Sequence, residues 1–121
     1  MKIALTASNN TDLNAKVDLR FGRAPYFAIV DLDNNKVRFI ENSAQQNASG
    51  AGIQAAQTIV DQEIKELITG NVGPKAFKVL NQTKIKVYTT QQDTIKEIIT
   101  KYKNNSLEEI NAPTNNGHAG S

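Results

Sequence analysis

The feature that most constrains the fold of this chain is an early β-hairpin pattern followed by alternating helical and strand patterns. Residues 26–32 form a nearly continuous apolar run of strand-favouring residues, and a strand pattern resumes at residues 37–40. Between the two runs stands Asp33-Asn34-Asn35, which is typical of a turn. This arrangement predicts two antiparallel strands. The alternation of apolar residues in residues 2–6 predicts one more strand before them.

Beyond the hairpin, apolar residues recur at helical spacing in three segments. The first helix is predicted from Ile53, Ala56, Val60 and Ile64, the second from Pro74 onward, and the third, capped by Asp93, from Ile95, Ile98, Ile99 and Tyr102. Short apolar runs at residues 67–68 and 85–88 predict strands between these helices. The order β-β-β-α-β-α-β-α gives an α/β fold with a mixed five-stranded sheet, and it suggests a ribonuclease-H-like motif.

The length of 121 residues fits one domain with one core. We expect residues 1–103 to form that domain. Residues 104–121 are mostly polar and rich in asparagine, which predicts a flexible C-terminal tail. The tail contains the sole histidine, His118, for which solvation is favoured over metal ligation.

Composition excludes several classes of protein. The chain has no cysteine, which removes disulfides, thiolate zinc sites and cysteine-ligated iron–sulfur clusters. The longest apolar run is far too short to cross a bilayer and no signal-peptide core follows the N-terminus, so we expect a cytoplasmic protein without a membrane partner. The net charge of +2 comes from scattered basic and acidic residues, which predicts no nucleic-acid partner.

The sequence offers no catalytic constellation. The predicted domain has no histidine that could activate a serine or threonine, and no carboxylates cluster at the ends of its strands. A two-metal nuclease would need acidic residues on the first strand, where Thr6 and Ser8 stand instead. We therefore predict a protein that is not an enzyme, with no catalytic residues and no identified metal ligand.

The predicted topology does point to a binding edge, because ligands of open α/β sheets bind beyond the carboxyl ends of the strands. Five segments are expected at that edge: residues 8–10, 21–25, 49–52, 70–74 and 89–93. Helix N-termini there offer unpaired N–H groups and a partial positive charge. Arg20 and Arg23 would add charge, so an anionic ligand is favoured.

Each of these features also has a purely structural interpretation. Residues 70–74 could form a plain strand-to-helix turn, and Phe21 is better explained as a core or loop anchor. Residues 50–55 formally match a dinucleotide-binding fingerprint, but an acidic ribose partner is missing, which disfavours a nucleotide site. Arg20 fits either interpretation. For Arg23 binding is favoured, because the glycine and proline around it give the loop a fixed shape.

Four sequence blocks, in order, carry a family resemblance: MKIA at residues 1–4, RFGRAPYF at 20–27, GAGIQAA at 50–56 and ITGNVGPKAF at 68–77. Through them the chain resembles the dinitrogenase iron-molybdenum cofactor biosynthesis family over about residues 1–103. The resemblance implies a ribonuclease-H-like fold. It also implies binding of iron-molybdenum cofactor or its iron–sulfur precursor, which are anionic clusters, as in members linked to nitrogen fixation. Relatives often carry histidine where this chain has Arg20.

The resemblance therefore predicts a non-catalytic carrier of an anionic iron–sulfur or iron-molybdenum cluster, acting in cofactor assembly or delivery. Its partners would be the proteins that donate or accept the cluster. The residues expected to contact the cluster are Arg20, Phe21, Gly22, Arg23, Ser49, Gly50, Gly52, Gly70, Asn71 and Gly73. The alternative is a regulatory module that binds a small anion, a nucleotide or a protein, and that uses no cofactor.

Overall fold

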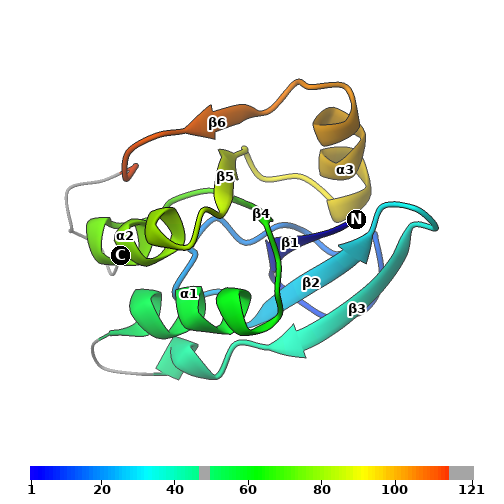
Figure 1. The fold of residues 1–121 in the computed structure, drawn as a ribbon. Coiled ribbons are helices and arrows are strands. Elements are labelled where there is room, and N and C mark those ends of the chain that lie inside the picture. The colour runs from blue at the N-terminus through cyan, green and yellow to red at the C-terminus, as the bar shows by residue number, and fades with distance from the viewer. Residues whose placement is uncertain (47–49, 115–121) are drawn as a thin grey trace.

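The computed structural model describes residues 1–46 and 50–114. Its elements are β1 (Lys2–Ala7), β2 (Tyr26–Asp31), β3 (Lys36–Glu41), the 3-10 helix η1 (Ser43–Gln46), α1 (Ala51–Asp61), β4 (Glu66–Thr69), α2 (Pro74–Gln82), β5 (Lys86–Thr89), α3 (Ile95–Lys103) and β6 (Glu108–Ile110). The strands form one six-stranded sheet in the order β3-β2-β1-β4-β5-β6 (Figure 1). None of the described helices is long and apolar enough to span a bilayer.

Strand β1 lies inside the sheet and sets the direction of its neighbours. It pairs antiparallel with β2, and β2 pairs antiparallel with β3, which confirms the predicted hairpin. On its other side β1 runs parallel to β4, and β4 runs parallel to β5. Strands joined through a helix in one sheet are expected to be parallel in this way. The predicted mixed α/β sheet with three helices is therefore confirmed.

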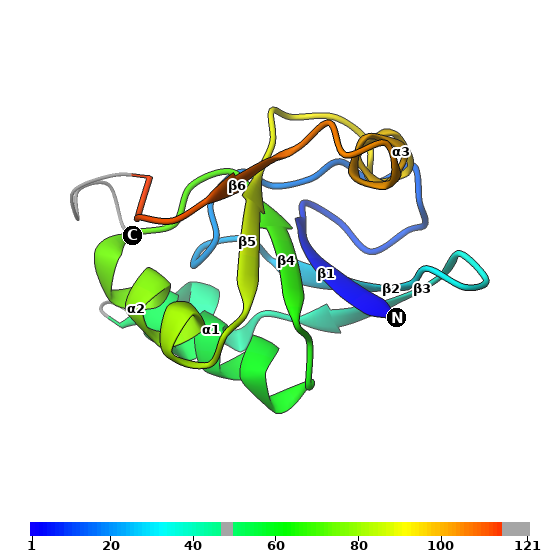
Figure 2. The same cartoon turned by 45° about the horizontal axis from the view of Figure 1, so that its top comes forward.

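The helices cover both faces of the sheet (Figure 2). Helices α1 and α2 pack on one face, over a core that includes Ala4 of β1, while α3 packs on the other, over a core that includes Ile3 and Leu5. Neighbouring residues of β1 thus enter different cores, as the pleat of a strand requires. The predicted apolar face of α3 is confirmed, with Ile95, Ile98 and Ile99 buried.

The sheet has six strands, so the predicted count of five is wrong. The sixth strand, β6, pairs antiparallel with β5 and lies in the segment that was expected to be a flexible tail. Its sequence Glu-Glu-Ile is short and has no alternating apolar pattern. Leu107 and Ile110 pack against the cores on the two opposite faces of the sheet. Residues 115–121, which include His118, lie outside the described residues.

Two details of the predicted helices are also wrong. In α1 the buried residues are mostly small, and Ile53 is 40% exposed, because glycine and alanine let this helix approach its neighbours closely. The helix ends at Asp61, so Ile64 follows it. In α3 the N-cap is Thr94 and not Asp93: the Thr94 hydroxyl accepts a hydrogen bond from the Glu97 N–H at 3.2 Å.

Candidate functional site

The candidate site lies at the edge where β1, β4 and β5 end and where α2 and α3 begin. The parallel pairing of these strands brings their carboxyl ends together, as the sequence predicted. Isolated β-bridges join the loops of this edge, Arg20 to Asn71 and Lys16 to Thr94. The loop of residues 18–25, which leads into β2, is therefore fastened to the loop that follows β4.

Close contacts at glycines fix the shape of the 18–25 loop. A Cβ atom on Gly22 would lie 2.9 Å from the backbone nitrogen of Gly52 in α1, and one on Gly70 would lie 2.5 Å from Cβ of Leu19. Real Cβ atoms do not approach other atoms so closely, so both positions require glycine. Phe21 is buried, 6.0 Å between ring centroids from Phe27, which confirms its expected role as an anchor. Gly22, Gly70 and Phe21 thus shape the site from within the protein.

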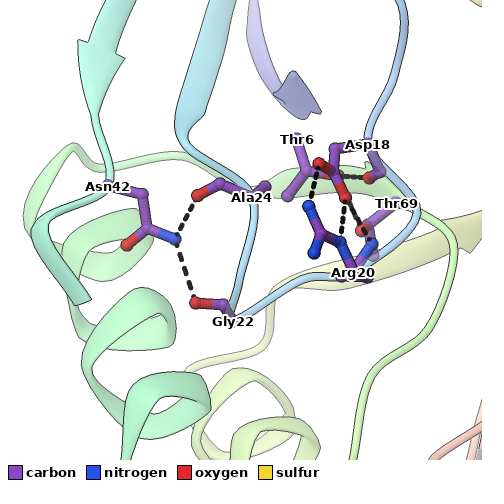
Figure 3. A network of polar contacts seen from close by, with 7 residues as sticks. All are labelled: Thr6, Asp18, Arg20, Gly22, Ala24, Asn42 and Thr69. Atoms are coloured by element: carbon purple, nitrogen blue, oxygen red, sulfur yellow. Dashed lines mark hydrogen bonds and ion pairs between the residues drawn. The ribbon is translucent and has the colours of Figure 1, made fainter. Parts of the chain in front are cut away.

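Asn42, a buried residue just after β3, holds the same loop from its other side (Figure 3). Its side-chain amide donates to the carbonyl oxygen of Ala24 at 2.8 Å and to that of Gly22 at 3.3 Å. Its backbone N–H donates to the carbonyl oxygen of Pro25 at 2.9 Å. The loop therefore has no freedom to change its path without breaking buried hydrogen bonds.

Two buried threonines anchor the start of the loop. The hydroxyls of Thr6 in β1 and Thr69 in β4 lie 2.7 Å apart, and the Thr6 hydroxyl donates to the carbonyl oxygen of Asp18 at 2.5 Å. The Asp18 N–H returns a hydrogen bond to the Thr6 carbonyl oxygen at 2.9 Å. Asp18 is thereby fixed directly above the ends of the two central strands.

Asp18 in turn fixes Arg20. The guanidinium donates through Nε to Oδ1 at 3.1 Å and through Nη2 to Oδ2 at 2.9 Å, and the Arg20 backbone N–H also reaches Oδ1 at 2.9 Å. Burial alone would raise the pKa of Asp18, but these hydrogen bonds and the positive charge of Arg20 hold that pKa below its usual value. The hydrogen bonds and charge of Asp18 likewise raise the pKa of Arg20. The two side chains form a bidentate ion pair.

The pair borders a shallow cleft of about 460 Å³. The cleft is lined by Ser8, Asp18, Leu19, Arg20, Pro25 and Gln92. The side chain of Asp18 is 8% exposed, whereas that of Arg20 is 66% exposed, so the guanidinium is the charged group that a ligand would meet. Among the described residues no group of three or more His, Cys, Asp or Glu side chains could hold a metal ion. The described residues of the cleft can therefore bind a ligand through hydrogen bonds and through the charge of Arg20.

The glycine-containing loop after β4 provides fewer N–H groups than its sequence suggests. The Asn71 N–H donates to the Leu19 carbonyl oxygen at 2.7 Å, and the Val72 N–H donates to the Thr114 hydroxyl at 2.8 Å. Gly73 is the N-cap of α2 and has an extended backbone. Asn71 therefore joins the site by holding the 18–25 loop.

The remaining residues predicted to contact a ligand are Gly50, Gly52, Arg23 and Ser49. Gly52 contacts Gly22, and Gly50 is the N-cap of α1 with a left-handed φ of 75°. Arg23 is half-buried in the 18–25 loop. Ser49 lies outside the described residues.

Sequence patterns did not predict the polar residues that support the loop: Thr6, Asp18, Asn42, Thr69 and Thr114. One signal could have revealed a member of this set, because an aspartate two residues before an arginine can form an ion pair beside the glycine motif. The others make contacts with residues 12 to 63 positions away in the chain, which no local pattern announces.

A sequence profile of the family described as dinitrogenase iron-molybdenum cofactor matches residues 1–105. The chain belongs to this family. A curated relative, an uncharacterized protein of Methanocaldococcus jannaschii, is 34% identical over 113 residues, which cover 91% of this chain and 92% of the relative.

Solved structures agree with this family assignment. The apo form of the orange protein from Desulfovibrio gigas superimposes on this protein with a TM-score of 0.89 at 34% identity, and the match covers 94% of this chain and 96% of the orange protein chain. A Thermotoga protein provisionally described as NifB superimposes with a TM-score of 0.81, also at 34% identity, covering 96% and 98%. The resemblance that was stated from four sequence blocks is therefore confirmed.

Proposed function

We propose that this protein is a non-catalytic carrier for an anionic iron–sulfur or iron-molybdenum type cluster, in cofactor assembly or delivery. The observation that carries the proposal is the rigid 18–25 loop, which presents the guanidinium of Arg20 at a cleft above the strand ends. An arginine oriented by an ion pair at such an edge suits a charged ligand that must be bound and then released. The family description supports the nature of that ligand.

The mode of binding follows from the residues present. The sequence has no cysteine to ligate iron, and the described residues hold no cluster of carboxylates or histidines. The cluster would instead be held by Arg20 and Arg23 through charge and hydrogen bonds, against the backbone of the loops around the cleft. Binding without metal–protein bonds favours transfer, so the partners would be proteins that donate or accept the cluster.

The sheet topology supports a related proposal about architecture. The order of the first five strands, with β2 antiparallel to β1, fits the ribonuclease-H-like motif that the sequence suggests. In this protein the first strand carries Thr6 where a metal-dependent nuclease needs an acidic residue. The Thr6 hydroxyl donates a hydrogen bond to the Asp18 carbonyl oxygen instead. These features support a binding role over hydrolysis.

Anaerobic reconstitution with iron, sulfide and molybdate tests the proposal. Wild-type protein is expected to retain metal after desalting, whereas the double variant Arg20→Ala, Arg23→Ala loses most of it. The matched control Lys36→Ala, Arg38→Ala removes two positive charges from β3, away from the cleft, and is expected to retain metal. Equal metal content in the wild type and in the Arg20→Ala, Arg23→Ala variant would remove the proposed site.

A second function has one observation in its favour. Asp18 neutralises much of the charge of Arg20, so the cleft suits a small anion as well as a large polyanion. A regulatory module that senses phosphate, a nucleotide or an acidic protein segment would use the same edge. Protein that stays metal-free after reconstitution, yet unfolds at a higher temperature in phosphate or a nucleotide, would favour this alternative.

A further inference from the structure

The hydrogen bonds between Asp18 and Arg20 leave a particular part of the guanidinium for a ligand. An arginine side chain has five N–H donors in a planar fork. Asp18 accepts from Nε and from Nη2, so the edge that remains consists of Nη1 and the second N–H of Nη2. Within residues 1–46 and 50–114, no partner of Nη1 is found, and the side chain is 66% exposed.

This remaining edge has a fixed orientation. The Asp18 carbonyl oxygen accepts a hydrogen bond from the Thr6 hydroxyl, and the Asp18 N–H donates to the Thr6 carbonyl oxygen. The Asp18 carboxylate also accepts from the Arg20 backbone N–H. The chain on both sides of Arg20 is fastened to Asn71, because the Asn71 N–H donates to the Leu19 carbonyl oxygen at 2.7 Å and the Phe21 N–H donates to the Asn71 carbonyl oxygen at 3.2 Å. Of the three remaining N–H donors, one on Nη1 and one on Nη2 therefore lie side by side in one plane at the mouth of the cleft, without the rotamer freedom of an ordinary surface arginine.

Two parallel N–H donors match a ligand that offers two neighbouring acceptor atoms. We propose that Asp18 is a positioning residue that makes this edge selective for such ligands, of the phosphate or sulfate type, over anions with a single acceptor atom. The inference deepens the proposed function and rests on the anion contact of Arg20. Asp18 acts through Arg20: as a bare negative charge it would only weaken the binding of every anion.

These two roles of Asp18 predict opposite results for Asp18→Asn, which removes the charge and breaks the two-point contact. A positioning role predicts that the ratio of chloride to phosphate dissociation constants falls by about tenfold, the equivalent of one charge-assisted hydrogen bond. A role through charge alone predicts that both anions bind more tightly, and phosphate more so because it carries the larger negative charge, so that this ratio rises.

The experiment is a titration of the full chain with sodium phosphate and with sodium chloride at constant ionic strength, followed by ¹⁵N–¹H spectra of the 18–25 amides and of the Arg20 Nε–H. The control Asp12→Asn removes one charge from an exposed aspartate in the loop after β1, and it should leave the ratio unchanged. A second variant, Arg20→Lys, keeps the charge and Asp18 but has no fork. It should show the same loss of preference, and it keeps the test decisive if Asp18→Asn does not fold.

Three outcomes decide the matter. A preference for phosphate that disappears in both Asp18→Asn and Arg20→Lys, together with a displaced Nε–H signal in Asp18→Asn, supports the inference. A ratio that is unchanged or higher in these variants, or no preference in the wild type, overturns it. Protein that holds no metal cluster but keeps an Asp18-dependent preference for phosphate would contradict the proposed carrier function and leave this inference standing.

Discussion

Replacing Asn42 by alanine should destabilise the whole protein, because this one side chain holds the loop that carries Arg20. The substitution removes three hydrogen bonds of the Asn42 side chain. Its amide N–H groups donate to the Ala24 carbonyl oxygen at 2.8 Å and to the Gly22 carbonyl oxygen at 3.3 Å, and its amide oxygen accepts from the Ala44 N–H at 3.2 Å. All three partners belong to buried residues, so water cannot replace Asn42 without opening the structure.

The magnitude follows from these distances. The short bond contributes about 1 kcal/mol and the two long ones about 0.5 kcal/mol each, and burying polar groups without a partner adds about 1 kcal/mol. Asn42→Ala should therefore lower the free energy of unfolding by about 3 kcal/mol, a large part of the 5–15 kcal/mol that is typical of a domain. For a chain of this size the melting temperature should fall by about 10 °C.

Urea denaturation at neutral pH measures this change, with an unchanged m-value showing that only stability has changed. The control is Asn81→Ala on the exposed surface of α2, which should change the free energy of unfolding by less than about 0.5 kcal/mol. A loss below about 1 kcal/mol for Asn42→Ala would refute the argument, since it would mean that the loop keeps its shape without these hydrogen bonds.

Two further predictions concern the same edge. Gly70→Ala should lower the free energy of unfolding by about 1–3 kcal/mol, because its new methyl group would meet backbone atoms of Leu19; a denaturation curve that coincides with the wild type would show that the loops can separate without cost. The pKa of Asp18 is lowered in the folded protein, so its contribution to stability is complete above the unfolded-state pKa and is lost as the pH falls through the lower, folded-state pKa. Denaturation midpoints measured from about pH 7 to about pH 2 should therefore fall less steeply at the acid end in Asp18→Asn than in the wild type, and parallel profiles would contradict the ion pair.

The parts of the fold that local patterns encode were predictable. The hairpin was evident because two apolar runs flank an Asp-Asn-Asn turn, and α3 because its three buried isoleucines recur at helical spacing. The face of α1 was not, since its packing depends on small residues such as Ala55 and Gly52 that carry little hydrophobic signal. Strand β6 was missed because its three residues, Glu108–Ile110, are too few and too polar to show an alternating apolar pattern, although they pair with β5.

The site was predictable only in outline. Topology placed the loop with Arg20 at the carboxyl ends of the parallel strands, and the glycines indicated close contacts without showing whether these were to a ligand or to the protein. Gly22 and Gly70 turned out to contact Gly52 and Leu19. The direction of the Arg20 side chain could not be predicted, because it depends on a carboxylate whose own position is set by Thr6 from another strand.

The contact between Thr114 and Val72 has a consequence for the order in which the protein folds. It joins residues 42 positions apart, and the contact between the Thr6 and Thr69 hydroxyls joins residues 63 positions apart. Such distant contacts close after local hairpins and helices, since the entropy of the intervening chain opposes them. We therefore predict that the cleft is completed late in folding, so that a ligand that needs its shape binds only to chains that have finished folding.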